Sequence, residues 1–327
     1  KYDVNILSLG RLNGLAYPLC HKVKIHSLNM KKHSTSQYKG FIKILWLLIA
    51  LKNVLKFYNK EHQPSVWNIT SPPLIVLFSL IKKSKNFFLY CEHTSPLGKH
   101  NNFIKNKIRS LILNTGDKTI SLNKKDDAYY KSINVDSKLI YNGCKRPENL
   151  NLSKDKNIIF VGRFSYEKNP LEALDIFYKS EIWKSGYKLK FFGDGIYIKD
   201  IILVSQNMKI ENYVEIISSE KDPSKIYENA AALIMTSHYE GLPMVLIESI
   251  SRGLPCLSYN CPQGPAEIII DGVNGFLIEN QNKNDFIKKL SSLDYEKLSR
   301  EKITSTFYKF DISNVIKDWK KMFENYF

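Results

Sequence analysis

Short apolar segments alternate with helix-like segments along nearly the whole chain, and this alternation limits the possible folds most strongly. Alternating strands and helices are typical of α/β proteins, in which helices cover both faces of a parallel sheet. The polar stretch 142–156 divides the alternation into two series. We therefore predict an α/β fold with two Rossmann-like domains that face a central cleft.

The two series supply the following elements. In the first half, the predicted strands are Val4–Leu9, Val23–His26, Val66–Ile69, Phe87–Tyr90, Lys118–Ile120 and Lys138–Ile140, with helices near 39–60, 73–83, 101–113 and 124–133. In the second half, the strands are Ile158–Val161, Lys188–Phe192, Val214–Ile217, Leu233–Thr236, Cys256–Tyr259 and Phe276–Ile278, with helices near 170–180, 196–207, 223–231, 243–252 and 283–292. A last helix at 311–326 carries one apolar face: Val315, Ile316, Trp319 and Phe323.

The chain is strongly basic, with 48 Lys and Arg residues against 32 Asp and Glu residues and a net charge of +16. Such an excess attracts nucleic acid, anionic lipid or phosphorylated substrates, although a lysine-rich composition accounts for it equally well. The segment 39–60 is either a basic amphipathic helix on an anionic membrane or a core helix with a lysine face. No apolar run reaches the roughly 18 residues of a spanning helix. Five scattered cysteines fit neither a zinc spacing nor a disulfide framework, which favours a reducing cytoplasm.

The stretch SHYEGLPMVLIE at 237–248 places two carboxylates across a junction between a loop and a helix. Glu240 follows the predicted buried strand 231–236, and Glu248 lies on the helix that Pro243 is predicted to begin. Ligands of parallel α/β sheets bind beyond the carboxyl ends of the strands. Carboxylates at such a place suit a ligand that is rich in hydroxyl groups.

Two cations flank the end of another strand in the stretch IIFVGRFSYEKN. Arg163 and Lys168 precede a helix that Pro170 is predicted to start. Two cations beside a helix N-terminus could bind a diphosphate. An ordinary solvated loop with two surface cations accounts for the same residues.

Three further segments carry possible site residues. Gly193 in FFGDG permits a close backbone approach to a ligand, or simply forms a turn. Gly264 to Glu267 in CPQGPAE could present backbone N–H groups to phosphate oxygens at a helix start. His93 in CEHTSPLG follows a predicted strand and is either structural or functional.

The second half of the chain resembles the retaining glycosyltransferases of family 4, which have the GT-B fold. The resemblance rests on VGRFSYEKN, FFGDG, TSHYEGLPMVLIESISRGLPCLSYN and CPQGPAEIIIDGVNGFLIE, in the order of that family and with its E-x7-E motif. In the first half, only the architecture and the CEHTS segment are similar. The resemblance implies these catalytic residues: Glu240, Arg163, Lys168 and His93. It also implies these donor-binding residues: Glu248, Gly162, Gly193, Gly264, Pro265, Glu267, Gly241 and Leu242.

The resemblance implies a role for each group. Arg163 and Lys168 would bind the donor diphosphate, Glu248 the ribose hydroxyls and Glu240 the transferred sugar, with His93 also at the sugar. No metal and no other cofactor is expected. The implied activity is transfer of a hexose, with retention, from a nucleotide-sugar (a UDP-sugar is expected) to a glycan or lipid-linked acceptor. Bacterial lipopolysaccharide, O-antigen or capsule synthesis at the cytoplasmic face of the inner membrane is the implied setting, with peripheral contact to anionic lipid and no nucleic acid partner.

Other functions stay open from sequence alone. A sugar-nucleotide epimerase of the same fold, an inactive relative, and a basic module that binds membranes or nucleic acid are the alternatives.

The expected domains are an N-terminal acceptor domain at 1–145 and a donor domain at 154–310, with helix 311–327 joining the first. Members of the family usually have a strand, a glycine loop and a long helix before the segment that matches 2–9. We therefore expect the N-terminal domain to lack its first strand and helix.

Overall fold

The computed structural model describes residues 4–10, 22–30, 40–58, 65–70, 72–81, 86–93, 103–147, 155–218, 220, 222–292 and 298–324. The chain divides into two compact units. Unit 1 comprises Lys1–Glu92, Asn102–Ile120 and Tyr130–Ser137. Unit 2 comprises His93–Asn101, Ser121–Tyr129 and Lys138–Phe327, so its contacts include the last helix. The predicted domain boundaries stay predictions.

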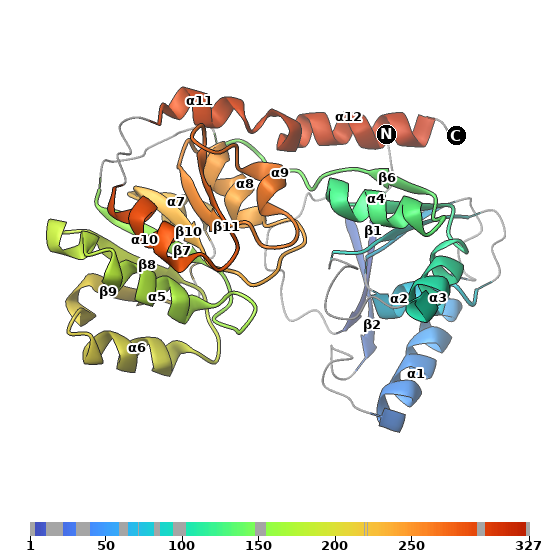
Figure 1. The fold of residues 1–327 in the computed structure, drawn as a ribbon. Coiled ribbons are helices and arrows are strands. Elements are labelled where there is room, and N and C mark those ends of the chain that lie inside the picture. The colour runs from blue at the N-terminus through green and yellow to red at the C-terminus, as the bar shows by residue number, and fades with distance from the viewer. Residues whose placement is uncertain are drawn as a thin grey trace. The chain divides into compact units, whose positions relative to one another are not determined.

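Unit 2 contains a six-stranded sheet (Figure 1), whose paired strands are all parallel. Its strands are β7 (Asn157–Val161), β8 (Lys188–Phe192), β9 (Val214–Ile217), β10 (Ala232–Met235), β11 (Cys256–Tyr259) and β12 (Gly275–Ile278). The spatial order is β12-β11-β10-β7-β8-β9. This is the order of a doubly wound nucleotide-binding sheet, and it reverses between β7 and β10.

Helices and buried aromatic rings complete unit 2. The helices are α4 (Lys124–Ser132), α5 (Pro170–Lys179), α6 (Ile198–Asn207), α7 (Pro223–Tyr227), α8 (Met244–Ser251), α9 (Pro265–Ile268), α10 (Lys283–Ser291), α11 (Arg300–Ser305) and α12 (Ile312–Glu324), with the last turn of α4 belonging to unit 1. Phe160 of β7 and Phe191 of β8 lie 5.3 Å apart between ring centroids, in a core that continues to α10. Burial on both sheet faces explains why the central strand β10 is wholly apolar. Toward the edge of the sheet, β8 instead alternates Lys188 and Lys190 with the buried residues Leu189 and Phe191.

Among its described residues, unit 1 contains parallel strand pairs and helices. β1 (Asn5–Gly10) pairs with β2 (Lys24–Met30), and a four-stranded sheet has the order β3-β4-β5-β6. These four strands are Val66–Ile69, Phe87–Cys91, Lys118–Ser121 and Ser137–Leu139, the last of which crosses into unit 2. The helices are α1 (Gly40–Tyr58), α2 (Pro72–Phe78) and α3 (Phe103–Leu113).

Helix α1 has a side that packs in the core. Trp46 and Ala50 are buried against Leu77 of α2, whereas Lys52 and Lys56 are exposed, as the core-helix interpretation predicts. Leu48 and Ile49 of the same helix are exposed, so the membrane-surface interpretation stays a prediction. In the part of the chain that the structure describes, no helix has the length and hydropathy that crossing a membrane requires.

The structure corrects three details of the predicted helices. Helix α7 ends at Tyr227 rather than 231, because Glu228 is extended and Asn229 has a positive φ of 60°. Pro243 is the N-cap of α8, with ψ at 101°, rather than its first helical residue. On α12, Ile316 is exposed, and Val315 and Met322 are the buried residues.

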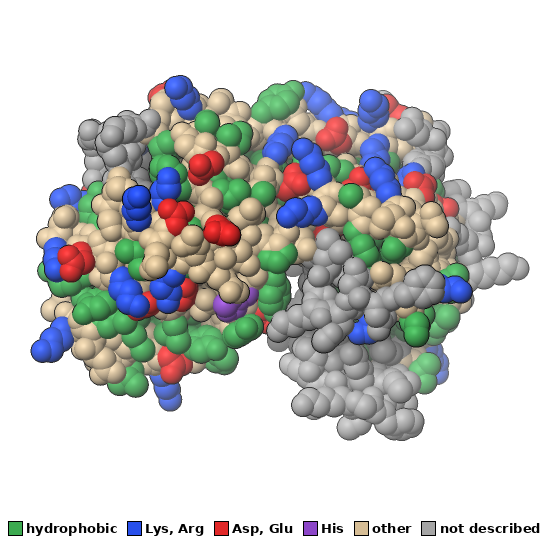
Figure 2. Space-filling view, viewed as in Figure 1, with side chains coloured by type: hydrophobic (Ala, Val, Ile, Leu, Met, Phe, Trp, Pro, Cys, Tyr) green, Lys and Arg blue, Asp and Glu red, His purple; other side chains and the backbone are tan. Residues whose placement is uncertain are grey.

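The positive charge is not gathered in one place on the visible face. Figure 2 shows Lys and Arg side chains spread over that face and interleaved with Asp and Glu side chains. A nucleic-acid site usually requires a basic stripe or patch, and this face shows none among the described residues.

Candidate functional site

The predicted site residues of unit 2 gather where the strand order reverses. β7 and β10 are neighbours in the sheet, although β8 and β9 lie between them in the chain. Residues 162–169 follow β7, and residues 236–240 follow β10. At such a reversal the two loops lead away on opposite sides of the sheet and leave a crevice for a ligand.

Lys168 and Glu240 form the centre of this site. The Lys168 ammonium (Nζ) donates to Glu240 Oε1 at 2.6 Å, and the Ser237 hydroxyl donates to the same oxygen at 2.6 Å. The Glu240 side chain is only 9% exposed. A buried carboxylate of this kind is stable only with a charged or hydrogen-bonding partner. The structure therefore brings together two predicted catalytic residues that lie 72 positions apart.

Further hydrogen bonds hold the two loops together. The backbone N–H of His238 donates to Glu167 O at 2.9 Å, and the Thr236 hydroxyl donates to Asn169 O at 2.8 Å. Arg163 lies exposed, near enough to Glu167 to act electrostatically on its carboxylate. Arg163 is thus at the same loop as Lys168 but outside the Lys168–Glu240 pair.

The Glu248 carboxylate accepts a hydrogen bond from a buried tyrosine. The Tyr227 hydroxyl donates to Glu248 Oε2 at 2.7 Å, and Tyr227 is fully buried. Burial raises the pKa of Glu248, and the Tyr227 hydrogen bond and the charge of Arg252 offset this only in part. No described residue is shown to hydrogen-bond to Glu248 Oε1, which can accept from a ligand hydroxyl.

Sequence reasoning missed Tyr227 and Arg252. The Arg252 guanidinium lies 4.7 Å from the centroid of the Tyr227 ring and donates to Glu248 O at 2.9 Å. Arg252 is the C-cap of α8, four residues after Glu248, and this spacing could have drawn attention to it. Tyr227 comes from a different helix, and nothing in the local sequence marks it.

Replacing Glu248 by Gln should weaken nucleotide binding and stabilise the empty protein above acidic pH. A carboxyl whose pKa is raised on folding stabilises the fold below its ordinary pKa and loses that contribution as pH rises. Gln keeps the acceptor for Tyr227 without the charge. The melting temperature of the variant relative to wild type should therefore increase between about pH 4 and pH 8. Affinity for nucleotide should fall about tenfold to a hundredfold, as for loss of a hydrogen bond to a charged group.

Glu211→Gln, at an exposed carboxylate on a short 3₁₀ helix, is the control. It should change neither quantity. A pH-independent difference in melting temperature would contradict the role of Glu248 burial.

Gly264 joins the segment 261–267 to the Glu240 loop. Its φ is +93°, and a Cβ there would lie 2.4 Å from Pro243 Cδ and 2.8 Å from Gly241 O. Only glycine permits this approach. The predicted donor-binding residues Gly241 and Gly264 therefore lie against each other.

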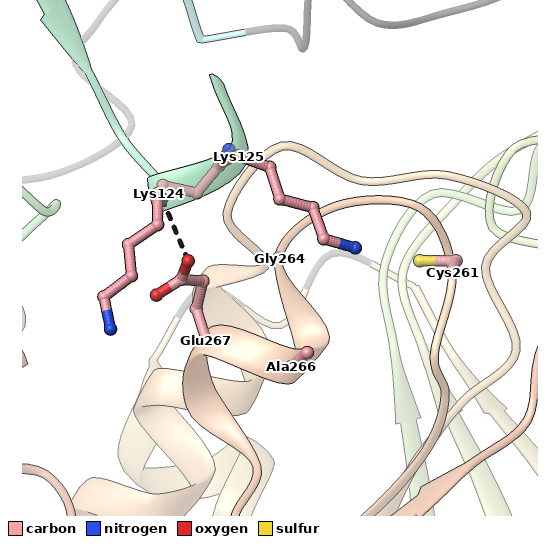
Figure 3. A pocket seen from close by; sticks show the side chains of 7 residues that line it. Lys124, Lys125, Cys261, Gly264, Ala266 and Glu267 are labelled. Carbon is pink, nitrogen blue, oxygen red and sulfur yellow. Dashed lines mark hydrogen bonds between the residues drawn. The ribbon is translucent and has the colours of Figure 1, made fainter. Parts of the chain in front are cut away.

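Glu267 is already engaged within unit 2. Its carboxylate accepts from the backbone N–H of Lys124 and from the Tyr141 hydroxyl, each at 2.9 Å. Figure 3 shows Lys124 on one side of this carboxylate, while the Lys125 side chain extends toward Cys261. A pocket of about 130 Å³ lies among these residues. Its lining consists of Asn123, Lys124, Lys125, Cys261, Gly264, Ala266 and Glu267.

Asn123 is a third residue that sequence reasoning missed. It caps α4 through a mutual pair of hydrogen bonds with Asp126, at 2.7 and 2.8 Å, and also donates to Gly241 O at 3.2 Å. The spacing of Asn123 and Asp126 in SLNKKDD is that of a capping box, so the cap was detectable. The contact with Gly241, 118 positions away, was not.

The other predicted donor-binding residues, Gly162, Gly193, Leu242 and Pro265, lie in packed surroundings. A Cβ on Gly193 would lie 1.9 Å from Gly162 O, so these two glycines touch at the ends of β7 and β8. Leu242 and Pro265 are buried. Any part that these two play in ligand binding would come from their backbone.

His93 lies two residues after β4, and the residues that follow it, 94–102, lie outside the described part of the chain. Desolvation lowers the pKa of its imidazole, which favours the neutral form near pH 7. Its predicted contact with the sugar stays a prediction. Within the described residues, no three His, Cys, Asp or Glu side chains are grouped so that they could hold a metal ion; the expectation of no metal cofactor also stays a prediction.

Residues 145–310 match the family model described as "Glycosyl transferases group 1". The chain is similar to the amylovoran biosynthesis glycosyltransferase of Erwinia amylovora, with 28% identity over 307 residues, which cover 90% of this chain and 81% of the relative.

Two solved structures resemble this one. A lipopolysaccharide outer core galactosyltransferase in its apo form has a TM-score of 0.73 and 19% identity, covering 94% of this chain and 85% of its own. The HepE protein of Anabaena, in complex with UDP-glucose, has a TM-score of 0.73 and 13% identity, covering 98% and 99%. The predicted α/β fold of the GT-B type, with two Rossmann-like domains, is confirmed.

Proposed function

Because this chain belongs to the group 1 glycosyl transferases, we propose that it transfers a hexose from a UDP-sugar to a glycan or lipid-linked acceptor. The proposal includes retention of configuration, as in family 4, and a place in bacterial lipopolysaccharide, O-antigen or capsule synthesis. That the chain is a glycosyltransferase follows from its family and its named relative. The relative's role in amylovoran biosynthesis and the UDP-glucose bound to a structural neighbour support the finer statement.

The observation that carries the proposal is the Lys168–Glu240 pair at the reversal between β7 and β10. An ammonium at the carboxyl ends of these strands suits the diphosphate of a nucleotide-sugar. Glu240 would then face the transferred sugar, and Glu248 on α8 would accept from the ribose hydroxyls.

The chemistry follows from where charge develops. As the bond between the sugar C1 and the phosphate oxygen breaks, positive charge grows on the sugar and negative charge on the leaving diphosphate. Lys168 and Arg163 would stabilise that negative charge, and pre-oriented charges of this kind supply large rate effects. Retention would follow from attack on the same face, with the donor phosphate taking the acceptor proton.

We also propose that the enzyme works at the cytoplasmic face of the inner membrane. The net charge of +16 would attract the protein to an anionic lipid surface. Transfer to a lipid-linked acceptor would require such a location.

Nucleotide binding without metal tests the donor site. UDP should raise the melting temperature equally in EDTA and in Mg²⁺, because Lys168, Arg163 and backbone N–H groups would take the place of a cation. At a ligand concentration of 100 times Kd, the expected stabilisation is about 2.7 kcal/mol.

If UDP stabilised the protein only in the presence of Mg²⁺ or Mn²⁺, the expectation that the donor binds without a metal would be wrong. A larger shift in melting temperature with GDP than with UDP would indicate a GDP-sugar donor instead of a UDP-sugar. Stabilisation by RNA alone would contradict the proposal. Mass analysis of a lipid-linked acceptor after incubation with a panel of UDP-sugars then tests the transfer itself.

A further inference from the structure

Helix α3 turns apolar side chains outward. Ile104, Ile108 and Leu111 are 68%, 52% and 65% exposed. Their spacing of four and three residues places them in one stripe along the helix. An ordinary surface helix has the opposite arrangement, with its apolar stripe against the core.

The inward side of α3 is held mainly by polar contacts. Arg109 donates to the buried carboxylate of Glu92 at 3.1 Å, and the Ser110 hydroxyl donates to Ile133 O at 2.7 Å. Leu113 is buried at the end of the helix. These contacts fix the rotation of α3, so the outward stripe is a property of the fold and not of a loosely attached helix.

Cations flank the stripe, and acidic residues are missing from its sequence. Lys105 and Lys107 are exposed on the two sides of the stripe. The sequence contains no Asp or Glu between His93 and Gly116. On α2, which packs against α3, Val76 is also exposed.

We propose that this surface, Ile104, Ile108 and Leu111 with Lys105 and Lys107, binds the interface of an anionic lipid bilayer. An aliphatic stripe between lysines is the pattern of helices that lie in a membrane interface, with apolar chains among the acyl groups and ammonium groups at the phosphates. Lysine is depleted from protein–protein interfaces, which disfavours a protein partner. The inference names the surface for the membrane location proposed above and rests on that location, but it does not depend on sugar transfer.

Co-sedimentation of the purified full chain with vesicles tests the surface without any substrate. The probes are vesicles of phosphatidylcholine with about 30% phosphatidylglycerol, and vesicles of phosphatidylcholine alone. The wild type should bind the anionic vesicles more strongly, and added salt should weaken binding. The triple variant Ile104→Ser, Ile108→Ser, Leu111→Ser should bind at least about tenfold more weakly.

The double variant Ile196→Ser, Leu203→Ser is the matched control. These two residues in unit 2 are 79% and 57% exposed, so the change removes exposed apolar groups elsewhere. It should bind vesicles like the wild type. The triple variant must keep the wild-type melting temperature and UDP response, and Lys105→Gln with Lys107→Gln provides a second variant that should reduce only the anionic selectivity.

Equal vesicle binding by wild type and triple variant would overturn the proposal. A wild-type dimer that the triple variant converts to a monomer, without any effect of lipid, would also overturn it, since the stripe would then be a subunit interface. Vesicle binding that persists when UDP causes no stabilisation would support this inference while contradicting the proposed donor site.

Discussion

Replacing Lys168 by Met is expected to lower kcat by about 10²–10³-fold, the effect of removing one charge-stabilising donor from a preorganised site. The Lys168 ammonium lies 2.6 Å from Glu240 and has donors left for a ligand. Because Glu240 orients it before the donor arrives, its stabilisation of a growing diphosphate charge requires little rearrangement. Turnover of the UDP-sugar identified by thermal shift, with product UDP as the signal, measures the effect.

Met also removes the partner of a buried carboxylate, so stability must be followed separately. The double variant Lys168→Met, Glu240→Gln should recover most of the melting temperature lost by the single variant, yet none of its turnover. Lys179→Met, at an exposed lysine paired with Asp175 on α5, is the control and should keep full activity. A kcat within threefold of wild type in the Lys168→Met variant would refute the role of Lys168.

Replacing Gly193 by Ala should destabilise unit 2 by about 3 kcal/mol or more, through overpacking against a neighbouring backbone. The added Cβ would lie 1.9 Å from the carbonyl oxygen of Gly162. Neither backbone can retreat easily, because β7 and β8 pair along their whole lengths. Urea unfolding followed by circular dichroism measures the loss, and a low yield of folded protein would be consistent with it.

Gly272→Ala separates steric overlap from backbone strain. Gly272 also has a positive φ, +71°, but a Cβ there would meet nothing within 4 Å. Its replacement should therefore cost only the left-handed conformation, about 1–2 kcal/mol. Equal losses of unfolding free energy at the two positions would show that the overlap with Gly162 adds nothing to the destabilisation.

The fold was predictable because the strands can be recognised from short segments of the sequence. The segments around Phe160 and Ile234 are almost wholly apolar, as strands buried on both faces must be. Helices separate successive strands of the sheet in unit 2. Helix ends were less predictable: α7 stops where Asn229 takes a positive φ, and no glycine or proline marks that point.

The site was predictable only in part. Lys168, Glu240 and Glu248 stand in recognisable motifs, and the strand order brings the first two together. Partners from distant segments were beyond sequence reasoning. Tyr227 behind Glu248 is one example, and Tyr141 on the Glu267 carboxylate is another, because such contacts depend on three-dimensional packing rather than on local pattern.

The contact between Gly193 and Gly162 bears on how donor preference should be sought in similar sequences. The sheet requires glycine at position 193 whatever ligand the crevice holds, because a Cβ there would overlap Gly162 O. Its presence therefore carries information about architecture and almost none about the ligand. Comparisons meant to assign a donor gain more from positions whose side chains can vary without disturbing the sheet, such as the exposed Tyr239 beside Glu240.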